Sequence, residues 1–187
     1  QAVLSKQKDN NTKKFIIYIN MGASDNNNYT IKILEKLSYF FNKSNFHIKI
    51  VIGPFFKKIN IKKIKLISSS FKNVSCIEDQ VKYINSMKSI SLGIINSGNI
   101  KYEIAVLGSP FILIANDRKS LKFCNYFKKE IYCKSFKNFE IPDEKKLKIY
   151  INNLYENYEI IKKKYKVNKI TISSKNIKNL CKKILKK

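Results

Sequence analysis

The chain has 187 residues, of which 44% are hydrophobic and 27% charged, and this composition is typical of one folded domain with its own core. It excludes a disordered chain, a collagen-like repeat and a disulfide miniprotein, and no apolar run approaches the roughly 18 to 20 residues of a membrane span. The net charge of +25 comes almost wholly from lysine, since Arg118 is the only arginine. Proteins that bind phosphates usually use arginine, whose guanidinium forms two parallel hydrogen bonds. An AT-rich genomic base composition, which favours lysine codons, therefore explains this charge better than a dedicated nucleic-acid role does.

Short β-branched runs alternate with helical patterns along the first 115 residues. Strands are predicted at Phe15–Asn20, His47–Gly53, Asn73–Ile77, Leu92–Asn96 and Pro110–Ala115. Helical spacing of apolar residues predicts helices between them, at Ile31–Phe41, Ile61–Ser70, Val81–Lys88 and Ile100–Leu107. This alternation predicts an α/β fold, a Rossmann-like parallel sheet of about six strands with right-handed crossovers and helices on both faces.

The pattern weakens beyond residue 115. We expect a helix at Leu121–Phe127, an edge strand at Ile131–Cys133 and a long helix from Asp143 through Ile161. A last helix would carry Ile177, Leu180 and Ile184 on one face. No repeat or low-complexity linker divides the chain, so residues 15–187 are interpreted as one domain and the polar residues 1–14 as an incoming linker.

The cysteines and the single histidine form no motif typical of a metal site or a catalytic triad. Cys76, Cys124, Cys133 and Cys181 form no CxxC pair, and buried thiols in a reducing compartment account for them. His47 begins a predicted strand with no nucleophile or ligand partner close to it in sequence. We therefore expect neither a metal site nor a cofactor, and no Ser-His-Asp triad.

In a Rossmann-like sheet the ligand lies beyond the carboxyl ends of the strands, so the loop after the first strand is a candidate site. Gly22 lets the backbone approach a phosphate, and Ser24 and the following helix start offer hydrogen-bond donors. The competing interpretation is an ordinary turn in which Ser24 and Asp25 cap the helix. The residues alone leave both interpretations open.

The loop after the fourth strand is the second candidate. It reads Ser97-Gly98-Asn99, and the helix behind it carries Glu103 in its first turn. A carboxylate at this place can accept hydrogen bonds from both hydroxyls of a ribose. A surface glutamate in a first helical turn is also common because it suits the helix dipole.

Taken together, the two loops resemble those of a known family of nucleotide-sugar-binding domains. MGASD after the first strand and SGNIKYEIAVLGSP around Glu103, Gly108 and Pro110 are similar to the C-terminal, nucleotide-sugar-binding half of GT-B glycosyltransferases. The nearest group is that of the UDP-2,4-diacetamido-2,4,6-trideoxy-altropyranose hydrolases of pseudaminic acid biosynthesis and glycosyltransferase family 28. These proteins typically show GGSD, GGSxxxE and a G-x-P entering the fifth strand. The resemblance extends over roughly the whole chain, including the segment Ala2-Val3-Leu4.

The resemblance implies a role for each matching position. Gly22, Ala23 and Ser24 would face the diphosphate, and Ser97, Gly98 and Asn99 would line its sugar-phosphate side. Glu103 would bind the ribose, and the backbone of Ile77 would read the base. This sequence departs from the pattern at Ala23 and Ser97, which replace glycines, and at Asn116-Asp117-Arg118, which lacks the usual glutamine.

We therefore expect the UDP-sugar-binding half of a two-domain, cytoplasmic nucleotide-sugar hydrolase or glycosyltransferase in surface polysaccharide or nonulosonic acid biosynthesis. The partners implied are a UDP-sugar and an N-terminal Rossmann-like domain, which carries the catalytic histidine in the hydrolases. The start at Gln1, without a methionine, agrees with a piece of a longer protein. The alternatives are a degenerate scaffold and a basic nucleic-acid-binding module that uses the lysine-rich stretches Lys57–Lys65, Lys162–Lys169 and Lys182–Lys187.

Overall fold

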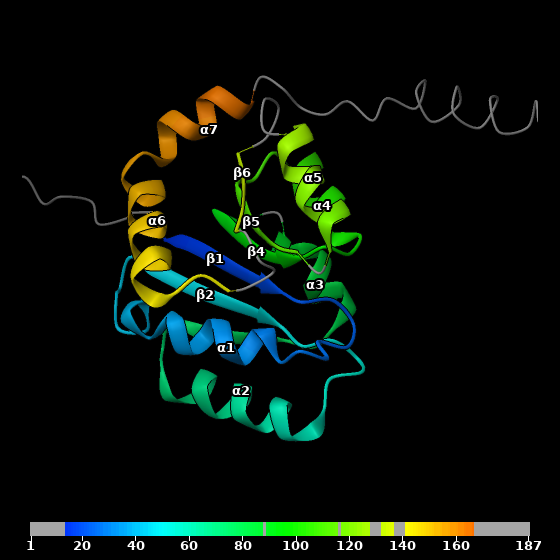
Figure 1. Cartoon of the computed structure of the whole chain (residues 1–187). Helices are drawn as coiled ribbons and strands as arrows, with labels where there is room; N and C mark the ends of the chain where they lie inside the picture. The colour runs from blue at the N-terminus through cyan, green and yellow to red at the C-terminus, as the bar shows by residue number, and fades with distance from the viewer. Residues whose placement is uncertain (1–13, 88, 116, 128–131, 137–140, 167–187) are drawn as a thin grey trace, which may run out of the picture.

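A computed structural model describes residues 14–87, 89–115, 117–127, 132–136 and 141–166. Its centre is one six-stranded parallel sheet in the order β3-β2-β1-β4-β5-β6 (Figure 1). The strands are β1 (Phe15–Asn20), β2 (Phe46–Val51), β3 (Val74–Ile77), β4 (Leu92–Asn96), β5 (Phe111–Ile114) and β6 (Cys133–Ser135). The predicted Rossmann-like sheet of about six strands is confirmed.

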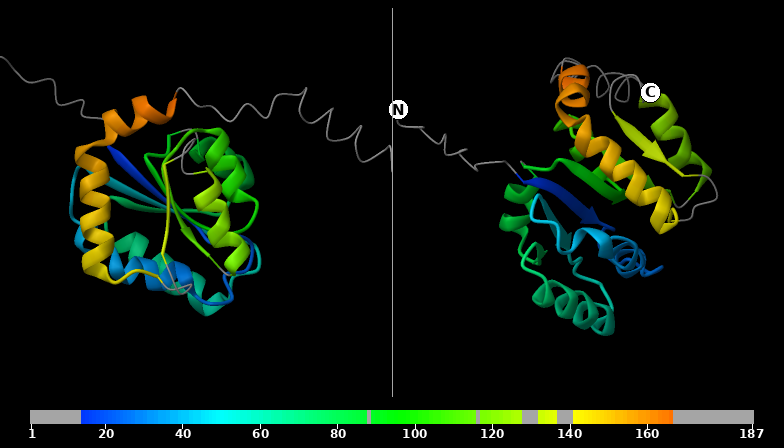
Figure 2. Two further views of the ribbon diagram at one scale, coloured as in Figure 1. Left: turned by 45° about the horizontal axis from the view of Figure 1, so that its top comes forward. Right: turned by 90° about the vertical axis from the view of Figure 1, so that its left-hand side faces the viewer.

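Helices cover both faces of the sheet (Figure 2). One face packs against α1 (Tyr29–Lys36), α2 (Lys58–Ser70) and α6 (Glu144–Glu156), with the short 3-10 turn Ser38–Phe40 beside them. The other face packs against α3 (Gln80–Met87), α4 (Ile100–Val106) and α5 (Arg118–Phe127). The two apolar cores therefore lie above and below the strands, as the alternating pattern predicts.

Strand β1 shows why the sheet forms in this part of the sequence. Ile17, Tyr18 and Ile19 are fully buried, because Ile17 and Ile19 face one core and Tyr18 faces the other. A strand buried on both faces needs an uninterrupted apolar run, and FIIYIN supplies it. The strand lies between β2 and β4 and ends on Asn20, which places the loop that follows in the middle of the sheet's carboxyl edge.

The C-terminal third departs from the predicted boundaries. The expected long helix is wrong in one respect: α6 ends at Glu156, Asn157 caps it, and α7 (Tyr158–Lys166) begins anew. The apolar stripe continues across the break because Tyr158 still packs on Phe15, so periodicity alone did not reveal it. The edge strand lies at Cys133–Ser135 rather than at Ile131–Cys133.

Helix α5 begins three residues earlier than predicted, at Arg118. The Asp117 carboxylate accepts hydrogen bonds from the amide and hydroxyl of Ser120, and this cap starts the helix. Residues 1–13 of the predicted linker (1–14), the last helix with Ile177, Leu180 and Ile184, and Cys181 lie outside the described residues.

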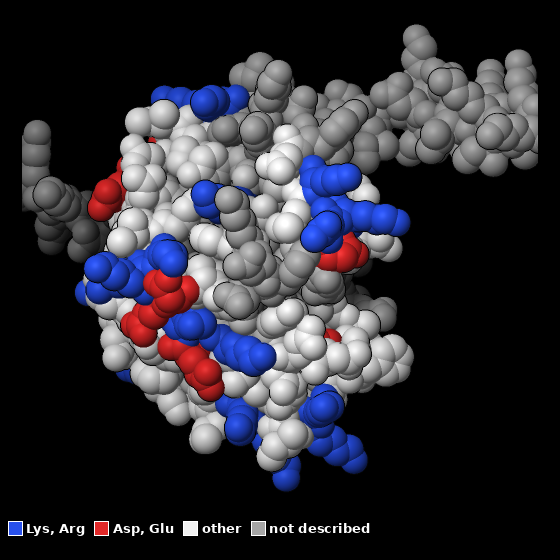
Figure 3. Space-filling view, in the orientation of Figure 1, with Lys and Arg blue, Asp and Glu red and all other residues white. Residues whose placement is uncertain are grey.

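The lysines are distributed over the surface. On the face seen in Figure 3 the basic side chains form separate groups, with acidic and uncharged residues between them. The lysines of α2 and its approach, from Lys57 to Lys65, are exposed, and Lys65 makes an ion pair of 2.9 Å with Glu78. No helix among the described residues is long and apolar enough to cross a membrane.

Candidate functional site

Two neighbouring strands end in the same Asn-x-Gly turn at the carboxyl edge of the sheet. At the end of β1 the Gly22 amide donates to the Asn20 side chain, at 2.9 Å. At the end of β4 the Gly98 amide donates to the Asn96 side chain, at 3.0 Å. An asparagine that accepts from the backbone two residues on closes the chain into a tight turn. Both candidate loops thus contain the same side-chain-capped turn.

Asn96 also joins the two loops. Its Nδ2 donates to the Met21 carbonyl at 2.7 Å while its Oδ1 accepts from Gly98. Gly22 has a φ of +82°, and a Cβ added there would lie 2.5 Å from Asn96 Nδ2. Glycine is therefore required at position 22 both for its left-handed backbone and for its contact with Asn96.

A third loop supports the first from the other side. The Phe55 amide donates to the Ala23 carbonyl at 2.9 Å. A Cβ on Gly53 would collide with the Gly22 and Ala23 backbone, so this close approach depends on a glycine after β2. Ala23 itself is exposed, and among the described non-glycine residues positive φ occurs at Asp25 and Asn28, not at Ala23. The departure from glycine at position 23 consequently produces no backbone strain.

Asp25 lies four residues before the first residue of α1, Tyr29, and its side chain caps the helix. Its two carboxylate oxygens accept from the Tyr29 and Thr30 amides, at 2.7 and 2.9 Å. These are the donors that we expected the helix start to offer to a phosphate, and they already have an acidic partner. The helix-cap interpretation therefore describes Asp25. Ser24, one residue before it, is half-buried.

Glu103 is exposed on α4, and Tyr83 of α3 donates its hydroxyl to Glu103 Oε2 at 2.7 Å. Burial, followed by this hydrogen bond, raises the pKa of Tyr83 well above its usual range. Tyr18 lies next to it on β1, where burial raises the pKa of its hydroxyl to about 12. Asn20 Nδ2 donates to the Tyr18 hydroxyl at 3.4 Å, so polar side chains extend from the first loop toward Glu103.

Ile77 ends β3, as predicted, but its backbone is engaged in the sheet. Its carbonyl accepts from the Ile52 amide at 2.9 Å. A carbonyl oxygen has two lone pairs, so this bond leaves one acceptor direction. The Ile77 side chain packs in the same apolar core as Ile100 and Ile104 of α4.

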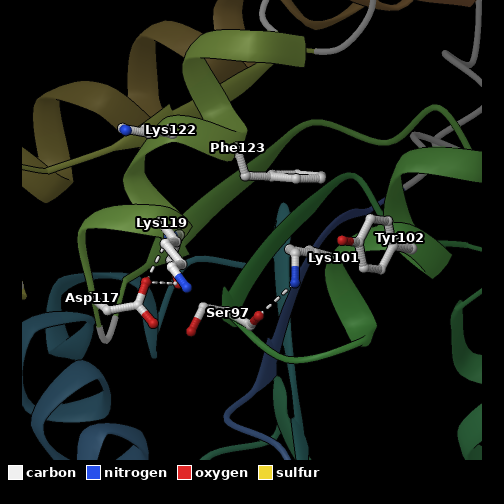
Figure 4. Close-up of a pocket in the computed structure, with 8 residues that line it drawn as sticks. Ser97, Lys101, Tyr102, Asp117, Lys119, Lys122 and Phe123 are labelled. Carbon is white, nitrogen blue, oxygen red and sulfur yellow. Dashed lines mark hydrogen bonds between the residues drawn. The ribbon is translucent and has the colours of Figure 1, made fainter.

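A hollow of about 480 Å³ lies between α4 and the loop that enters α5. Figure 4 shows its walls, which the following residues form: Ser97, Lys101 and Tyr102 on one side, and Asp117, Lys119, Ser120, Lys122 and Phe123 on the other. The Lys101 ammonium donates to the carbonyls of Ser97 and Gly98, at 2.6 and 3.1 Å. It also lies 4.4 Å from the centre of the Tyr102 ring. This lysine fixes a positive charge beside the fourth-strand loop.

The structure thus brings most of the predicted site residues to one edge of the sheet. Sequence reasoning missed Asn20 and Asn96, although the signal was present as I-N-x-G in both YINMG and IINSG. It also missed Gly53, Tyr83 and Lys101, whose roles depend on contacts between elements. No local sequence pattern predicts such contacts.

The remaining reactive groups lie elsewhere. Among the described residues no group of three or more His, Cys, Asp and Glu could hold a metal ion. Cys124 of α5 and Cys133 of β6 hydrogen-bond to each other, which lowers the pKa of the Cys124 thiol and raises that of Cys133. His47 Nε2 lies 2.9 Å from the Ser75 hydroxyl on the neighbouring strand, at the other side of the sheet from the hollow.

Comparison with known proteins identifies the fold. No protein-family model and no curated protein matches the sequence. Among solved structures, the chain is similar to the UDP-GlcNAc 2-epimerase from Neisseria meningitidis bound to UDP-GlcNAc, with a TM-score of 0.54, 19% identity, and coverage of 82% of this chain and 39% of the epimerase. The C-terminal domain of a glycosyl transferase group 1 family protein from Francisella tularensis matches with a TM-score of 0.55, 12% identity, and 83% and 82% coverage.

A third similar structure is the C-terminal CMP-Kdo binding domain of WaaA from Acinetobacter baumannii, with a TM-score of 0.52, 9% identity, and 82% and 88% coverage. The fold is that of a GT-B C-terminal domain. The chain spans about two fifths of the epimerase and most of the two isolated domains. At these identities the likeness establishes the fold, while ligand and activity depend on the site.

Proposed function

We propose that this chain is the UDP-sugar-binding half of a two-domain GT-B enzyme, a nucleotide-sugar hydrolase or glycosyltransferase of surface polysaccharide or nonulosonic acid biosynthesis in the cytoplasm. The observation that carries the proposal is the Asn96 bridge. It holds the Met21-Gly22 turn against the Ser97-Gly98 turn at the carboxyl edge of the sheet. In open α/β sheets this edge is where ligands bind.

The proposed ligand extends across this edge. Its diphosphate would lie against the backbone of Gly22, Ala23 and Ser24 on one side and of Ser97, Gly98 and Asn99 on the other. Lys101 supports this placement: two of the three ammonium donors bind carbonyls, and one remains for an anion. The sugar-phosphate end would enter the hollow beside Ser97, whose volume of about 480 Å³ is adequate for a monosaccharide.

The nucleoside would lie on the α3 and α4 side. Glu103 would accept the ribose hydroxyls, and the free acceptor direction of Ile77 would meet the base. The fold alone leaves the base open, because the Acinetobacter domain is a CMP-Kdo binding domain while the Neisseria epimerase is bound to UDP-GlcNAc. UDP is proposed on the resemblance of the two loop motifs to those of UDP-sugar enzymes.

The chemistry proposed is cleavage of the bond between the sugar and the phosphate, by water or by an acceptor. This chain would orient the donor and stabilise the charge that develops on the leaving diphosphate, through the Lys101 ammonium and through loop N–H groups other than those of Gly22 and Gly98, which donate to asparagine side chains. The histidine that activates water in the hydrolases belongs to their N-terminal domain. We therefore expect the chain alone to bind the nucleotide without turning over a UDP-sugar.

Calorimetry or ligand-observed NMR with UDP, CMP and ATP tests the binding half of the proposal. We expect weak binding with UDP ranked first, since the proposed N-terminal domain would supply half of the cleft. Lys62→Gln, on the exposed face of α2, is the control for general charge attraction and should leave UDP binding unchanged. Undetectable UDP binding at millimolar concentration would favour the degenerate scaffold.

An assay of UDP release from UDP-GlcNAc tests the catalytic half. We expect no release above the rate without protein from this chain. Release at enzymatic rates would place catalytic groups within the chain. It would contradict the proposal that the N-terminal domain supplies them. Binding of a DNA duplex that is tighter than binding of UDP at 0.15 M salt would instead support the nucleic-acid alternative, because general charge attraction is weakened at that salt concentration.

A further inference from the structure

We infer that Tyr83 is a positioning residue that fixes the Glu103 carboxylate for the ribose, a role that rests on the proposed function. The hydroxyl of Tyr83 donates to Glu103 Oε2 at 2.7 Å, from α3 to α4. Nothing in the motif resemblance assigns a role to position 83. The two residues are 20 positions apart in the chain, and the fold alone brings them together.

The Tyr83 hydroxyl stays protonated and is always available as a hydrogen-bond donor to the Glu103 carboxylate. Burial and the bond to Glu103 hold the pKa of Tyr83 far above neutrality, so the phenol keeps its proton and can only donate to the carboxylate. The bond uses one lone pair of Oε2 and leaves Oε1 for a ligand. A long glutamate side chain that is exposed to water would otherwise lose rotamer freedom when it binds, which weakens binding.

The surroundings of Tyr83 also tie Glu103 to the phosphate loop. Asn20 lies within hydrogen-bonding reach of the Tyr83 hydroxyl, and the same Asn20 side chain accepts from the Gly22 amide. Buried Asn20 and half-buried Tyr83 therefore connect the turn proposed for the diphosphate with the carboxylate proposed for the ribose.

The competing role for Tyr83 is structural only, as a brace between α3 and α4. Stability measurements cannot separate the two roles, because either one loses a hydrogen bond on substitution. Discrimination between UDP and 2′-deoxy-UDP does separate them. The two ligands differ by one ribose hydroxyl, so their affinity ratio reports the carboxylate–ribose contact and is insensitive to general loosening.

The test compares Tyr83→Phe with Tyr155→Phe, which removes a hydroxyl from an exposed ring of α6 beside Phe15 and Phe46. For Tyr83→Phe we expect UDP affinity to fall about 3- to 10-fold, the effect of one hydrogen bond, and the preference for UDP over 2′-deoxy-UDP to shrink. Tyr155→Phe should change neither quantity. In a Glu103→Ala background, where the carboxylate is absent, Tyr83→Phe should have no further effect on affinity.

Two results would overturn the positioning role of Tyr83 alone, and a third would overturn it together with the proposed function. Equal UDP affinity and equal ligand preference in the unsubstituted chain and Tyr83→Phe would overturn the positioning role while leaving the proposed function intact. A fall in affinity of the same size for both nucleotides, persisting in the Glu103→Ala background, would show that Tyr83 is only a brace. Absence of UDP binding by the unsubstituted chain would overturn the proposed function and this role together.

Discussion

The two ends of strand β1 are built by different chemistry. At the amino end Phe15 packs edge-on against Phe46, Tyr155 and Tyr158, with ring centres 5.3 to 5.5 Å apart. At the carboxyl end Asn20 accepts from the Gly22 amide, and Asn96 of the neighbouring strand bridges to Met21. Six residues thus lead from a cluster of aromatic rings to a set of directed hydrogen bonds.

This difference separates what maintains the fold from what can bind a ligand. Aromatic packing depends on area and shape, and it stabilises the sheet against α6 and α7 without creating a site. Directed hydrogen bonds hold exposed backbone in one conformation, and that is what a phosphate or a ribose requires. Substitutions at the amino end should therefore reduce stability, and substitutions at the carboxyl end should reduce binding.

The largest effect is expected from Phe46→Ala at the amino end. Phe46 is 3% exposed, and its ring contacts Phe15, Phe40 and Tyr155, so truncation leaves a cavity in the core. Urea unfolding followed by circular dichroism should show a loss of about 3 to 5 kcal/mol in the free energy of unfolding. UDP affinity of the folded fraction should be unchanged.

Ile149→Ala on α6 is the control for this substitution, because its side chain is 60% exposed. Its effect on stability should stay within about 0.5 kcal/mol. If Phe46→Ala does not fold, Phe46→Leu provides a milder test of the same packing. A loss of UDP affinity in folded Phe46→Leu would break the proposed separation between the two ends of the strand.

Gly22→Ala and Gly108→Ala form a matched pair that separates the effect of disturbing Asn96 from the effect of backbone strain. Both glycines have left-handed backbones, with φ of +82° and +69°, so alanine should lower the free energy of unfolding by about 1 to 3 kcal/mol at either position. Only at position 22 does the added Cβ meet Asn96, whereas nothing lies within 4 Å at position 108. We expect UDP affinity to fall in Gly22→Ala alone.

Thermal melts and UDP titrations of the two variants measure both effects. Equal UDP affinities would show that the contact between Gly22 and Asn96 is unnecessary for the site. A loss of affinity in Gly108→Ala as well would indicate that general loosening, rather than the bridge, weakens binding.

The fold was predictable because its signals are local. Runs such as FIIYIN and LGIIN mark strands within five or six residues, and their order along the chain implies crossovers between parallel strands. The break at Asn157 was missed because the apolar spacing continues through it. The start of α5 was misplaced because a single side chain, Asp117, decides it.

The site was predictable only in part, for a reason that the hydrogen bonds make plain. The positions of Gly22, Gly98 and Glu103 after their strands follow from local pattern and resemblance. Their partners lie far away in sequence: Asn96 reaches Met21 across 75 residues, and Tyr83 reaches Glu103 across 20. Such pairs depend on how strands and helices pack, so only a structure reveals them.

Glu103→Gln tests the proposed ribose contact at the carboxyl end of the sheet. The substitution keeps the shape of the side chain and removes its charge, so UDP affinity should fall by about 1 to 3 kcal/mol if the carboxylate accepts the ribose hydroxyls. Stability should change by no more than about 1 kcal/mol, because glutamine keeps an oxygen that can accept from the Tyr83 hydroxyl and an exposed first-turn carboxylate interacts only weakly with the helix dipole.

Melting temperature and UDP affinity of Glu103→Gln should be measured side by side. Glu144→Gln, which alters an exposed first-turn glutamate of α6, is the matched control and should leave UDP affinity unchanged. Unchanged UDP affinity in Glu103→Gln, in a protein that does bind UDP, would remove Glu103 from the site.

The smallest effect is expected at His47, near the amino end of β2. Burial lowers the pKa of its imidazole, and the neighbouring charges of Lys49 and Lys14 lower it further. The unfolded chain therefore binds this proton at a higher pH than the folded chain does. Below the unfolded pKa of about 6.5 the unfolded state gains protons first, so this histidine makes the protein less stable as the pH falls.

His47→Gln removes that titration and keeps a side chain that can hydrogen-bond with the Ser75 hydroxyl, which lies 2.9 Å from His47 Nε2. Melting temperatures at pH 8 and pH 5 should differ less in the variant than in the unsubstituted chain. UDP affinity at pH 8 should be the same in both, because His47 belongs to the end of the sheet that maintains the fold. An equal pH dependence of the two melting temperatures would show that the His47 pKa is not lowered by folding. A change in UDP affinity at pH 8 would mean that the amino end also influences the ligand.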